Sequence, residues 1–262
     1  MKITLLGTGG SAGLPQIGGL DGHGDWGRAD PREPRNIRTR ASIIIQTEAG
    51  ETILVDTGPD LRMQLVANGI RRVDAVFYTH AHADHIAGLD EVRILNRILG
   101  TPLPAYGTSE VLAELKQRFD YAFKPWNGGF FGRPVLLPQV ILPGHDFTAC
   151  GQDILPFEQD HGHGRSMGFR IGDFAYCTDV VRLDAAALSA LRGVRTWIVD
   201  CFTPAADHPT HAGLETVIEW VKYLQPTRTI LTHMGPLMDY QTLRATLPPG
   251  IEPGYDGMVL DI

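Results

Sequence analysis

The hydrophobic pattern alternates between short apolar runs of strand length and longer segments with helical spacing. Apolar runs bounded by Gly, Pro, Asp and Asn predict strands, and residues 48–51 form a hairpin turn between two of them. The predicted strands are 2–7, 41–47, 52–56, 73–78, 134–142, 153–158, 166–172, 174–179, 195–201, 228–233 and 255–262. Apolar positions three and four residues apart predict helices at 60–69, 85–99, 109–119 and 211–224.

Strand clusters alternate with helices in two halves of similar layout. This order predicts an α/β protein in which two mixed sheets pack face to face with helices outside. We expect a single domain over residues 1–262, because no linker or repeat divides the chain. A long loop rich in Gly and Arg, residues 7–40, interrupts the first sheet, and loops of that length are typically functional or disordered.

Composition excludes several classes of protein. The formal net charge of -7 argues against a surface built to hold nucleic acid, which needs a positive footprint. We expect no membrane association, because no apolar stretch is long enough to cross a bilayer and the N-terminus does not resemble a secretory signal. Three widely spaced cysteines do not resemble a disulfide framework, so we expect a reducing, cytoplasmic location.

The densest chemistry lies in "FYTHAHADHIAGLD", residues 77–90, directly after a predicted strand. It supplies His80, His82, Asp84 and His85, and imidazole with carboxylate is a ligand set for Zn²⁺, Mn²⁺ or Fe²⁺. One ion would use three of these ligands and a water, whereas the whole cluster, with ligands from elsewhere, allows two ions. The alternative is a solvated histidine-rich loop, which a cluster this dense makes a poor explanation.

Three further candidates lie where predicted strands end. His161 stands in "EQDHGHG", Asp179 ends "FAYCTD" and His233 ends "RTILTH". Side chains that end buried strands lie at the rim of a sheet, where sites are built. Each alone is as well explained by a turn or an exposed loop, but together with the dense cluster they indicate one site.

The ordered series "ILVDTGPD", "HAHADH", "DHGH", "YCTD", "VDC" and "LTHMG" resembles the metallo-β-lactamase superfamily. That resemblance implies a four-layer αββα sandwich with a dinuclear metal site. Within the superfamily, "GTGGSAGLP", "HPTHAGLETV" and "GYDGMVL" are similar to the branch that hydrolyses cyclic phosphodiesters, represented by phosphoribosyl 1,2-cyclic phosphate phosphodiesterase.

The resemblance implies a role for each candidate. His80, His82 and His161 would hold one divalent ion, Asp84, His85 and His233 a second, and Asp179 would bridge both, the ions being Mn²⁺ or Zn²⁺, with iron as a further option. Asp56 would orient the ligand histidines, unless it only begins a turn.

Asp84 and His211 are the residues expected to take part in catalysis, and His211 would protonate the leaving alkoxide. His163, Arg38 and His208 are weaker candidates for substrate contact, and the aromatic segment 126–131 could form a flap. Relatives in this branch often carry a structural zinc on a C-x-C-x-x-C loop. The corresponding segment here has no cysteine, and Pro236 stands where the completing histidine would be, so no additional structural zinc is expected.

The sequence therefore predicts a dinuclear metal hydrolase that cleaves a small anionic phosphodiester, a cyclic sugar or nucleotide among them, through a bridging hydroxide. The expected partner is that substrate, with a homodimer as an open option. The alternatives are a tRNA 3′-end endonuclease, which should carry a basic arm that we do not find, and a thioesterase or glyoxalase-type hydrolase. A non-enzymatic metal-binding protein is a third alternative, and the complete ligand set disfavours it.

Overall fold

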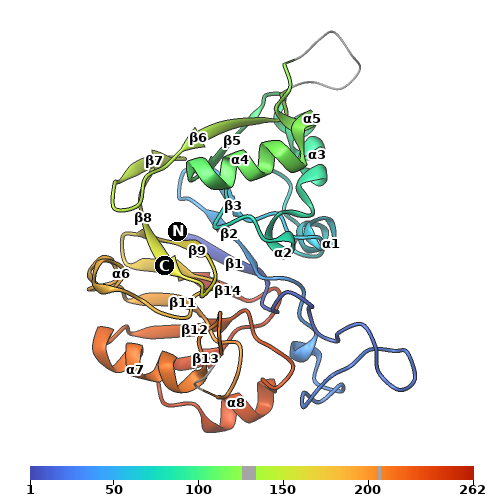
Figure 1. Cartoon of the computed structure of the whole chain (residues 1–262), viewed down its shortest axis with the longest axis vertical. Helices are drawn as coiled ribbons and strands as arrows, with labels where there is room; N and C mark the ends of the chain where they lie inside the picture. The colour runs from blue at the N-terminus through green and yellow to red at the C-terminus, as the bar shows by residue number, and fades with distance from the viewer. Residues whose placement is uncertain (126–133, 206–207) are drawn as a thin grey trace.

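The computed structural model describes residues 1–125, 134–205 and 208–262. The strands of this part of the chain form two mixed sheets of seven strands each (Figure 1). The first sheet runs, from one edge to the other, through Val259–Asp261 (β14), Lys2–Gly7 (β1), Ser42–Gln46 (β2), Thr52–Val55 (β3), Ala75–Phe77 (β4), Leu103–Gly107 (β5) and Leu136–Val140 (β6). The second runs through Ile251–Pro253 (β13), Arg228–Thr232 (β12), Thr196–Asp200 (β11), Phe174–Cys177 (β10), Arg165–Ile171 (β9), Gln152–Asp160 (β8) and Phe147–Ala149 (β7).

Helices cover the outer face of each sheet. Those on the first sheet are Leu61–Ala67 (α1), Ala83–Ile86 (α2), Val92–Leu99 (α3), Ser109–Arg118 (α4) and Asp120–Phe123 (α5), with the 3₁₀ turn Leu89–Glu91 (η2). Those on the second are Ala185–Ala190 (α6), Leu214–Leu224 (α7) and Tyr240–Thr246 (α8). Figure 1 shows the two helical layers on opposite sides of the paired sheets, so the predicted αββα sandwich is confirmed.

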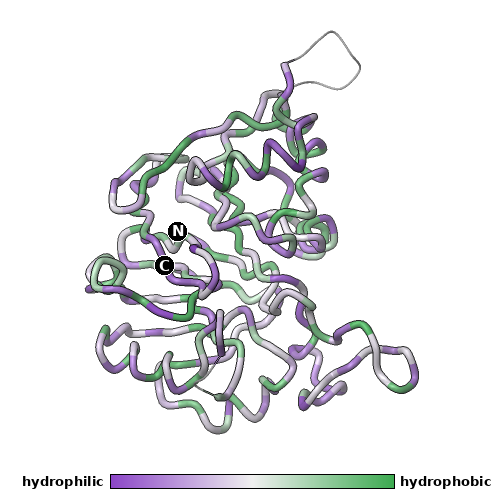
Figure 2. Tube along the Cα trace, viewed as in Figure 1, coloured by the Kyte–Doolittle hydropathy of each residue, from purple (hydrophilic) through white to green (hydrophobic). Residues whose placement is uncertain are grey.

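The period-two alternation of strand side chains builds three hydrophobic layers. Ile43 and Ile45 point between the sheets and pack with Phe169 of the second sheet, while Ile44 points outward and packs beneath α1–α5. A third cluster around Trp197 lies beneath α6–α8. Burying each aliphatic or aromatic side chain contributes about 1.5–3 kcal/mol to the free energy of folding relative to leaving it exposed. Figure 2 shows hydrophobic and hydrophilic positions alternating along the helices, as expected when only one helix face is buried.

Some predicted boundaries were wrong, for local physical reasons. The predicted helix 85–99 is three pieces, α2, η2 and α3, and the break between α2 and η2 lies at residues 87–88. A Cβ on Gly88 would lie 2.0 Å from the carbonyl oxygen of Gly58, so the chain there passes too close for any side chain. Strand β5 was not predicted, because Pro104 breaks its pattern, yet it pairs with both β4 and β6.

The long loop 7–40 contains the 3₁₀ turn Pro34–Asn36 (η1) and is tied to the C-terminal segment by Asp256. The Asp256 carboxylate accepts hydrogen bonds from the backbone N–H and hydroxyl of Thr8 at 2.9 and 2.8 Å. It accepts the same pair from Thr39 at 2.7 and 2.6 Å. Figure 1 shows the middle of the loop projecting from the body of the protein, while its two ends are held close to the sheets.

Both ends of the chain meet in the first sheet, where β1 pairs with β14. That the chain forms one domain stays a prediction. Among the described residues, no helix is both long enough and apolar enough to cross a membrane. The aromatic segment expected to form a flap, 126–131, lies outside the described residues.

Asp256 predicts a pH dependence of stability. Burial raises the pKa of Asp256 from 3.8 to about 6, although its hydrogen bonds from Thr39 and Thr8 oppose the rise. Because the folded state binds the proton more tightly, this carboxyl favours folding at low pH, and about 3 kcal/mol of that contribution is lost as the pH rises from about 4 to about 6. Asp256→Asn does not lose this stability as the pH rises, because an asparagine side chain does not titrate.

The free energy of unfolding, measured with urea for both proteins, should therefore rise in the wild type relative to Asp256→Asn as the pH is lowered from about 7 to about 4.5. A difference in unfolding free energy that is the same at both pH values would contradict the pKa assigned to Asp256.

Candidate metal centre

The candidate site lies at one edge of the sandwich, where parallel strands of both sheets end. Strands β3, β4 and β5 pair in parallel in the first sheet, and β10, β11 and β12 do so in the second. Parallel strands place their carboxyl ends at the same edge, which is where open α/β sheets bind ligands. The segments that follow β4, β10 and β12 carry six of the predicted metal ligands, and the seventh, His161, lies in the turn between the antiparallel strands β8 and β9.

One group of candidate ligands consists of His80, His82, His161 and Asp179, whose ligand atoms all lie within 4.8 Å of one another. His161 Nε2 is 3.2 Å from His82 Nδ1 and 3.6 Å from Asp179 Oδ1. His80 Nε2 is 3.8 Å from the same carboxylate oxygen. His82 is exposed and the other three are buried, so the group meets solvent at His82.

A second group consists of Asp84, His85, Asp179 and His233. His85 Nε2 lies 3.2 Å from Asp84 Oδ2 and 3.1 Å from Asp179 Oδ2. His233 Nε2 lies 3.7 Å from Asp84 Oδ2 and 3.5 Å from Asp179 Oδ1. Asp179 therefore belongs to both groups, and the structure brings together all seven residues predicted as ligands.

The buried ring nitrogens lack hydrogen-bond partners within the cluster, and their spacing is that of ligands around a divalent metal ion. His80 Nε2, His85 Nε2 and both ring nitrogens of His233 are buried without a hydrogen-bond partner of acceptable geometry. Buried polar atoms are rarely left unpaired. Ligand atoms around a tetrahedral ion with bonds of ~2.1 Å lie ~3.4 Å apart, which matches the spacings between these nitrogens and the carboxylates.

The electrostatics of the cluster require positive charge. His233 and the other imidazoles hold the pKa of Asp179 well below its usual range, despite a burial that would raise it. Burial alone would lower the pKa of His233, but the carboxylates of Asp179 and Asp84 raise it to about 9. Burial and the neighbouring His85 lower the pKa of His80. The carboxylates therefore stay ionised, and a divalent ion would replace the protons on the imidazoles that face them.

Backbone strain gathers at the same place. Asp56, Asp179 and His233 adopt positive φ of 63°, 53° and 53°, a region that only a few per cent of non-glycine residues occupy, although Asn, Asp and His enter it more often than the others. Strain of this kind persists only where the surrounding structure enforces it, and it is found at functional sites.

Hydrogen bonds behind the ligands set which ring nitrogen of each histidine faces the centre. The Asp56 carboxylate accepts from His85 Nδ1 at 2.8 Å and from the N–H and hydroxyl of Thr79 at 2.8 and 2.7 Å. Because the Thr79 hydroxyl donates to Asp56, its oxygen is free to accept from His80 Nδ1, 3.0 Å away. His161 Nδ1 donates to the carbonyl of Thr210 at 2.8 Å. His80, His85 and His161 therefore present Nε2 to the centre, whereas His82 turns its Nδ1 toward His161.

His211 adjoins the cluster and is held by a residue that the sequence did not single out. Its ring packs against His233 and His161, with centroids 4.6 and 5.0 Å away, and its Nδ1 donates to Asp200 Oδ2 at 2.8 Å. The same Asp200 oxygen accepts from the backbone N–H of Val180 at 3.0 Å. Asp179 follows β10, Asp200 ends β11 and His233 follows β12. This equivalent position at the end of a strand is the sequence signal that could have identified Asp200 as a site residue.

The three weaker candidates have different surroundings. His163 is exposed and belongs to none of the ligand groups. His208 is half-buried, with its ring 4.9 Å from that of Phe202 and 5.2 Å from that of His211, so it borders the site. Arg38 was predicted to contact substrate, and the structure corrects this. Its side chain is 1% exposed and donates to the carbonyls of Met238 and Gly235, so it anchors the long loop.

Comparison with known proteins gives the class. The family profile described as "Beta-lactamase superfamily domain" matches residues 51–234. The solved structure of a diphosphatase from the PhnP family is 31% identical, with a TM-score of 0.86, and the match covers 99% of this chain and 96% of that one. The chain therefore belongs to the beta-lactamase superfamily and, within it, to the PhnP family, which confirms the predicted resemblance.

Two other relatives mark the breadth of the superfamily. An octanoyltransferase of Porphyromonas gingivalis is 32% identical over 98% of this chain, but this chain spans only 51% of its length. The zinc-bound PqqB structure from Methylobacterium extorquens is 19% identical, covers 100% of both chains and has a TM-score of 0.79, which shows the shared fold.

The shared position of Asp179 predicts how the site responds to substitution. Asp179→Ala removes the only carboxylate common to both ligand groups, so we expect it to release at least one divalent ion per chain. Inductively coupled plasma mass spectrometry after reconstitution with Mn²⁺ or Zn²⁺ measures this directly. His163→Ala, an exposed histidine two residues from His161, is the matched control and should keep the wild-type metal content. Full retention of metal by Asp179→Ala would contradict the shared-ligand role.

Proposed function

We propose that the protein is a dinuclear metal hydrolase that cleaves a small sugar or nucleotide phosphodiester. The observation that supports this most directly is the pair of ligand groups that share Asp179 and adjoin the His211–Asp200 pair. The membership in a family that includes a diphosphatase supports hydrolysis at a phosphate group. Manganese and zinc are the ions that this set of imidazoles and carboxylates favours, and iron is compatible with it.

The charge of the site favours an anion even though the whole chain is acidic. Two divalent ions carry roughly +4, and within the two ligand groups only Asp84 and Asp179 oppose them with carboxylates. The local excess of positive charge would attract a phosphodiester. When bound, the ions would neutralise its oxygens as charge develops and lower the pKa of water.

The side chains around the ions have separate tasks. His80, His82, His161, Asp84, His85, Asp179 and His233 would hold the ions. Asp56 fixes the ring of His85 and, through Thr79, that of His80. Asp200 fixes His211 with Nδ1 as the donor, which leaves Nε2 to carry the proton for the leaving alkoxide.

The alternatives fit this chain less well. A short human tRNase Z shares the fold, with 17% identity and a TM-score of 0.70, but the net charge of -7 opposes a polymeric RNA substrate. Octanoyl transfer is the activity of a relative about twice as long. A cytoplasmic location and a homodimer stay predictions.

The first prediction of this assignment concerns activity. The protein reconstituted with Mn²⁺ or Zn²⁺ should hydrolyse bis(p-nitrophenyl) phosphate. It should lose that activity in EDTA, because the proposed chemistry depends on the bound ions. It should leave the monoester p-nitrophenyl phosphate and pre-tRNA nearly untouched. Cleavage of lactoylglutathione in the absence of any phosphodiester cleavage would refute the proposal in favour of a glyoxalase-type enzyme.

The second concerns His211 and its partner. His211→Ala should lower kcat by about two to four decades, the scale of a positioned general acid, and should keep both ions. Asp200→Asn should lower kcat by about one to two decades, because the ring of His211 loses its orienting carboxylate. His163→Ala, which changes an exposed residue that belongs to neither ligand group, should keep wild-type metal content. Loss of metal in His211→Ala would mean that His211 is a ligand instead.

A further inference from the structure

A second histidine, His208, lies beside the proposed general acid His211 in the segment between β11 and α7. Its ring is 5.2 Å from that of His211 and 4.9 Å from that of Phe202. His211 in turn contacts the metal centre, since its Nδ1 is 4.0 Å from Asp179 Oδ1 and its ring is 4.6 Å from that of His233. The rings become more exposed in the order His233, His211 and His208, so His208 lies on the solvent side of His211.

The backbone of Thr210 holds His208 in place. The N–H of Thr210 donates to His208 Nδ1 at 3.4 Å, while the carbonyl of Thr210 accepts from His161 Nδ1 at 2.8 Å. The segment also packs closely on the turn that carries His161, because a Cβ on Gly162 would lie 2.3 Å from the carbonyl oxygen of Pro209. Thr210 therefore positions one candidate metal ligand and His208 together.

The hydrogen bond from Thr210 decides which nitrogen of His208 can donate. A backbone N–H only donates, so Nδ1 of His208 is the acceptor and carries no proton. Burial and the neighbouring His211 lower the pKa of His208, so at neutral pH its ring holds a single proton, on Nε2. No described residue accepts a hydrogen bond from this Nε2–H. In His211, by contrast, Nδ1 donates to Asp200 and Nε2 is the nitrogen that carries the proton for the leaving oxygen.

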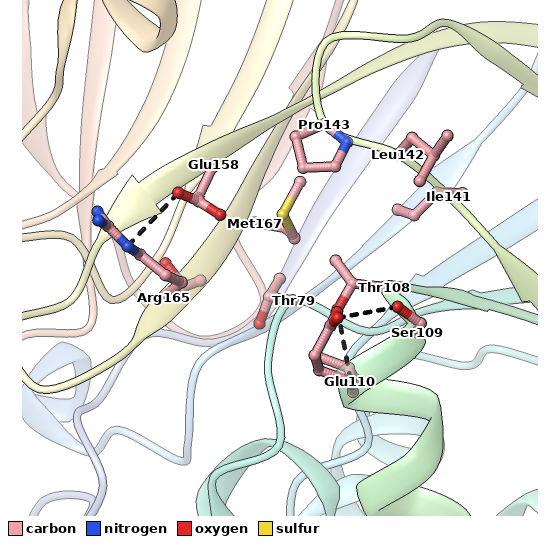
Figure 3. Close-up of a pocket in the computed structure, with 12 residues that line it drawn as sticks. Thr79, Thr108, Ser109, Glu110, Ile141, Leu142, Pro143, Glu158, Arg165 and Met167 are labelled. Carbon is pink, nitrogen blue, oxygen red and sulfur yellow. Dashed lines mark hydrogen bonds and ion pairs between the residues drawn. The ribbon is translucent and has the colours of Figure 1, made fainter.

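The organic group that carries the leaving oxygen must lie beside His211, which is expected to protonate that oxygen. The cavity of about 450 Å³ that Figure 3 shows, between the start of α4 and the strands β8 and β9, does not receive this group. Its lining includes Thr79 and Met167 but neither His211 nor any of the seven candidate ligands. The organic group therefore lies outside that cavity, where His208 is beside His211.

We propose that His208 determines specificity by donating a hydrogen bond from Nε2 to a hydroxyl oxygen of the organic group that carries the leaving oxygen. This inference rests on the phosphodiesterase function proposed above. A neutral N–H suits the uncharged hydroxyl of a sugar or polyol, whereas the phosphate oxygens are left to the ions. The two histidines then have separate tasks, because His211 transfers a proton and His208 selects the group that bears the leaving oxygen.

The test compares two diesters that differ by one hydroxyl, glycerol 1,2-cyclic phosphate and propane-1,2-diol cyclic phosphate. The wild-type metalloenzyme should prefer the glycerol compound in kcat/KM by about three- to tenfold, the scale of one hydrogen bond between uncharged groups. His208→Asn should abolish this preference, because the asparagine amide is too short to place a donor at the position of Nε2. His208→Gln is the matched control and should keep the preference, because its amide nitrogen can reach that position. Comparing the two diesters within each variant cancels any loss of folding or metal.

The position of the proton can be measured without turnover. Long-range proton–nitrogen correlation spectra of the zinc-loaded protein, with the His208 signals identified by their absence from His208→Asn, should show His208 protonated on Nε2 alone. A proton on Nδ1 would overturn the proposal, as would no preference in the wild type, a preference kept by His208→Asn or one lost by His208→Gln. Failure to cleave bis(p-nitrophenyl) phosphate and both cyclic diesters would instead overturn the proposed function.

Discussion

The arrangement depends on one buried carboxylate that faces imidazoles from both halves of the fold. Asp179 comes from the second sheet, and the nitrogens of His80 and His85 that point at it come from the first. Asp179 is 1% exposed and sits on a strained backbone with φ of 53°. An ionised carboxylate in such a place is costly unless positive charge surrounds it. Protons on His85 and His233 can supply that charge, and divalent ions would supply more of it while satisfying the unpaired nitrogens.

The rest of the fold holds the groups of this centre at fixed separations. Parallel pairing of β10, β11 and β12 brings Asp179, Asp200 and His233 to one edge, and the core between the sheets sets the distance to the ligands after β4. Asp56 and Asp200 play the same part on opposite sides, since each accepts the Nδ1 proton of one histidine and a backbone N–H. The geometry is therefore set by hydrogen bonds that do not themselves need the metal.

The sequence singled out most of the residues that the structure brings together here, because the signals for them are local. Four candidate ligands crowd into residues 80–85, and the others follow apolar strands, so period and position were enough. Asp200 occupies an equivalent position but has no histidine beside it in sequence, and its partner His211 becomes a neighbour only in the folded chain. Arg38 was misplaced because an arginine in a charged loop gives no sign that main-chain carbonyls of residues 235 and 238 will enclose it.

The central claim is that two cations lie side by side with Asp179 between them. Anomalous diffraction from crystals of the protein grown with manganese or zinc tests it most directly. We expect two peaks per chain, one within bonding distance of His80, His82 and His161 and the other of Asp84, His85 and His233, with an Asp179 oxygen at both. A single peak, or none with the imidazoles turned toward solvent, would contradict the account.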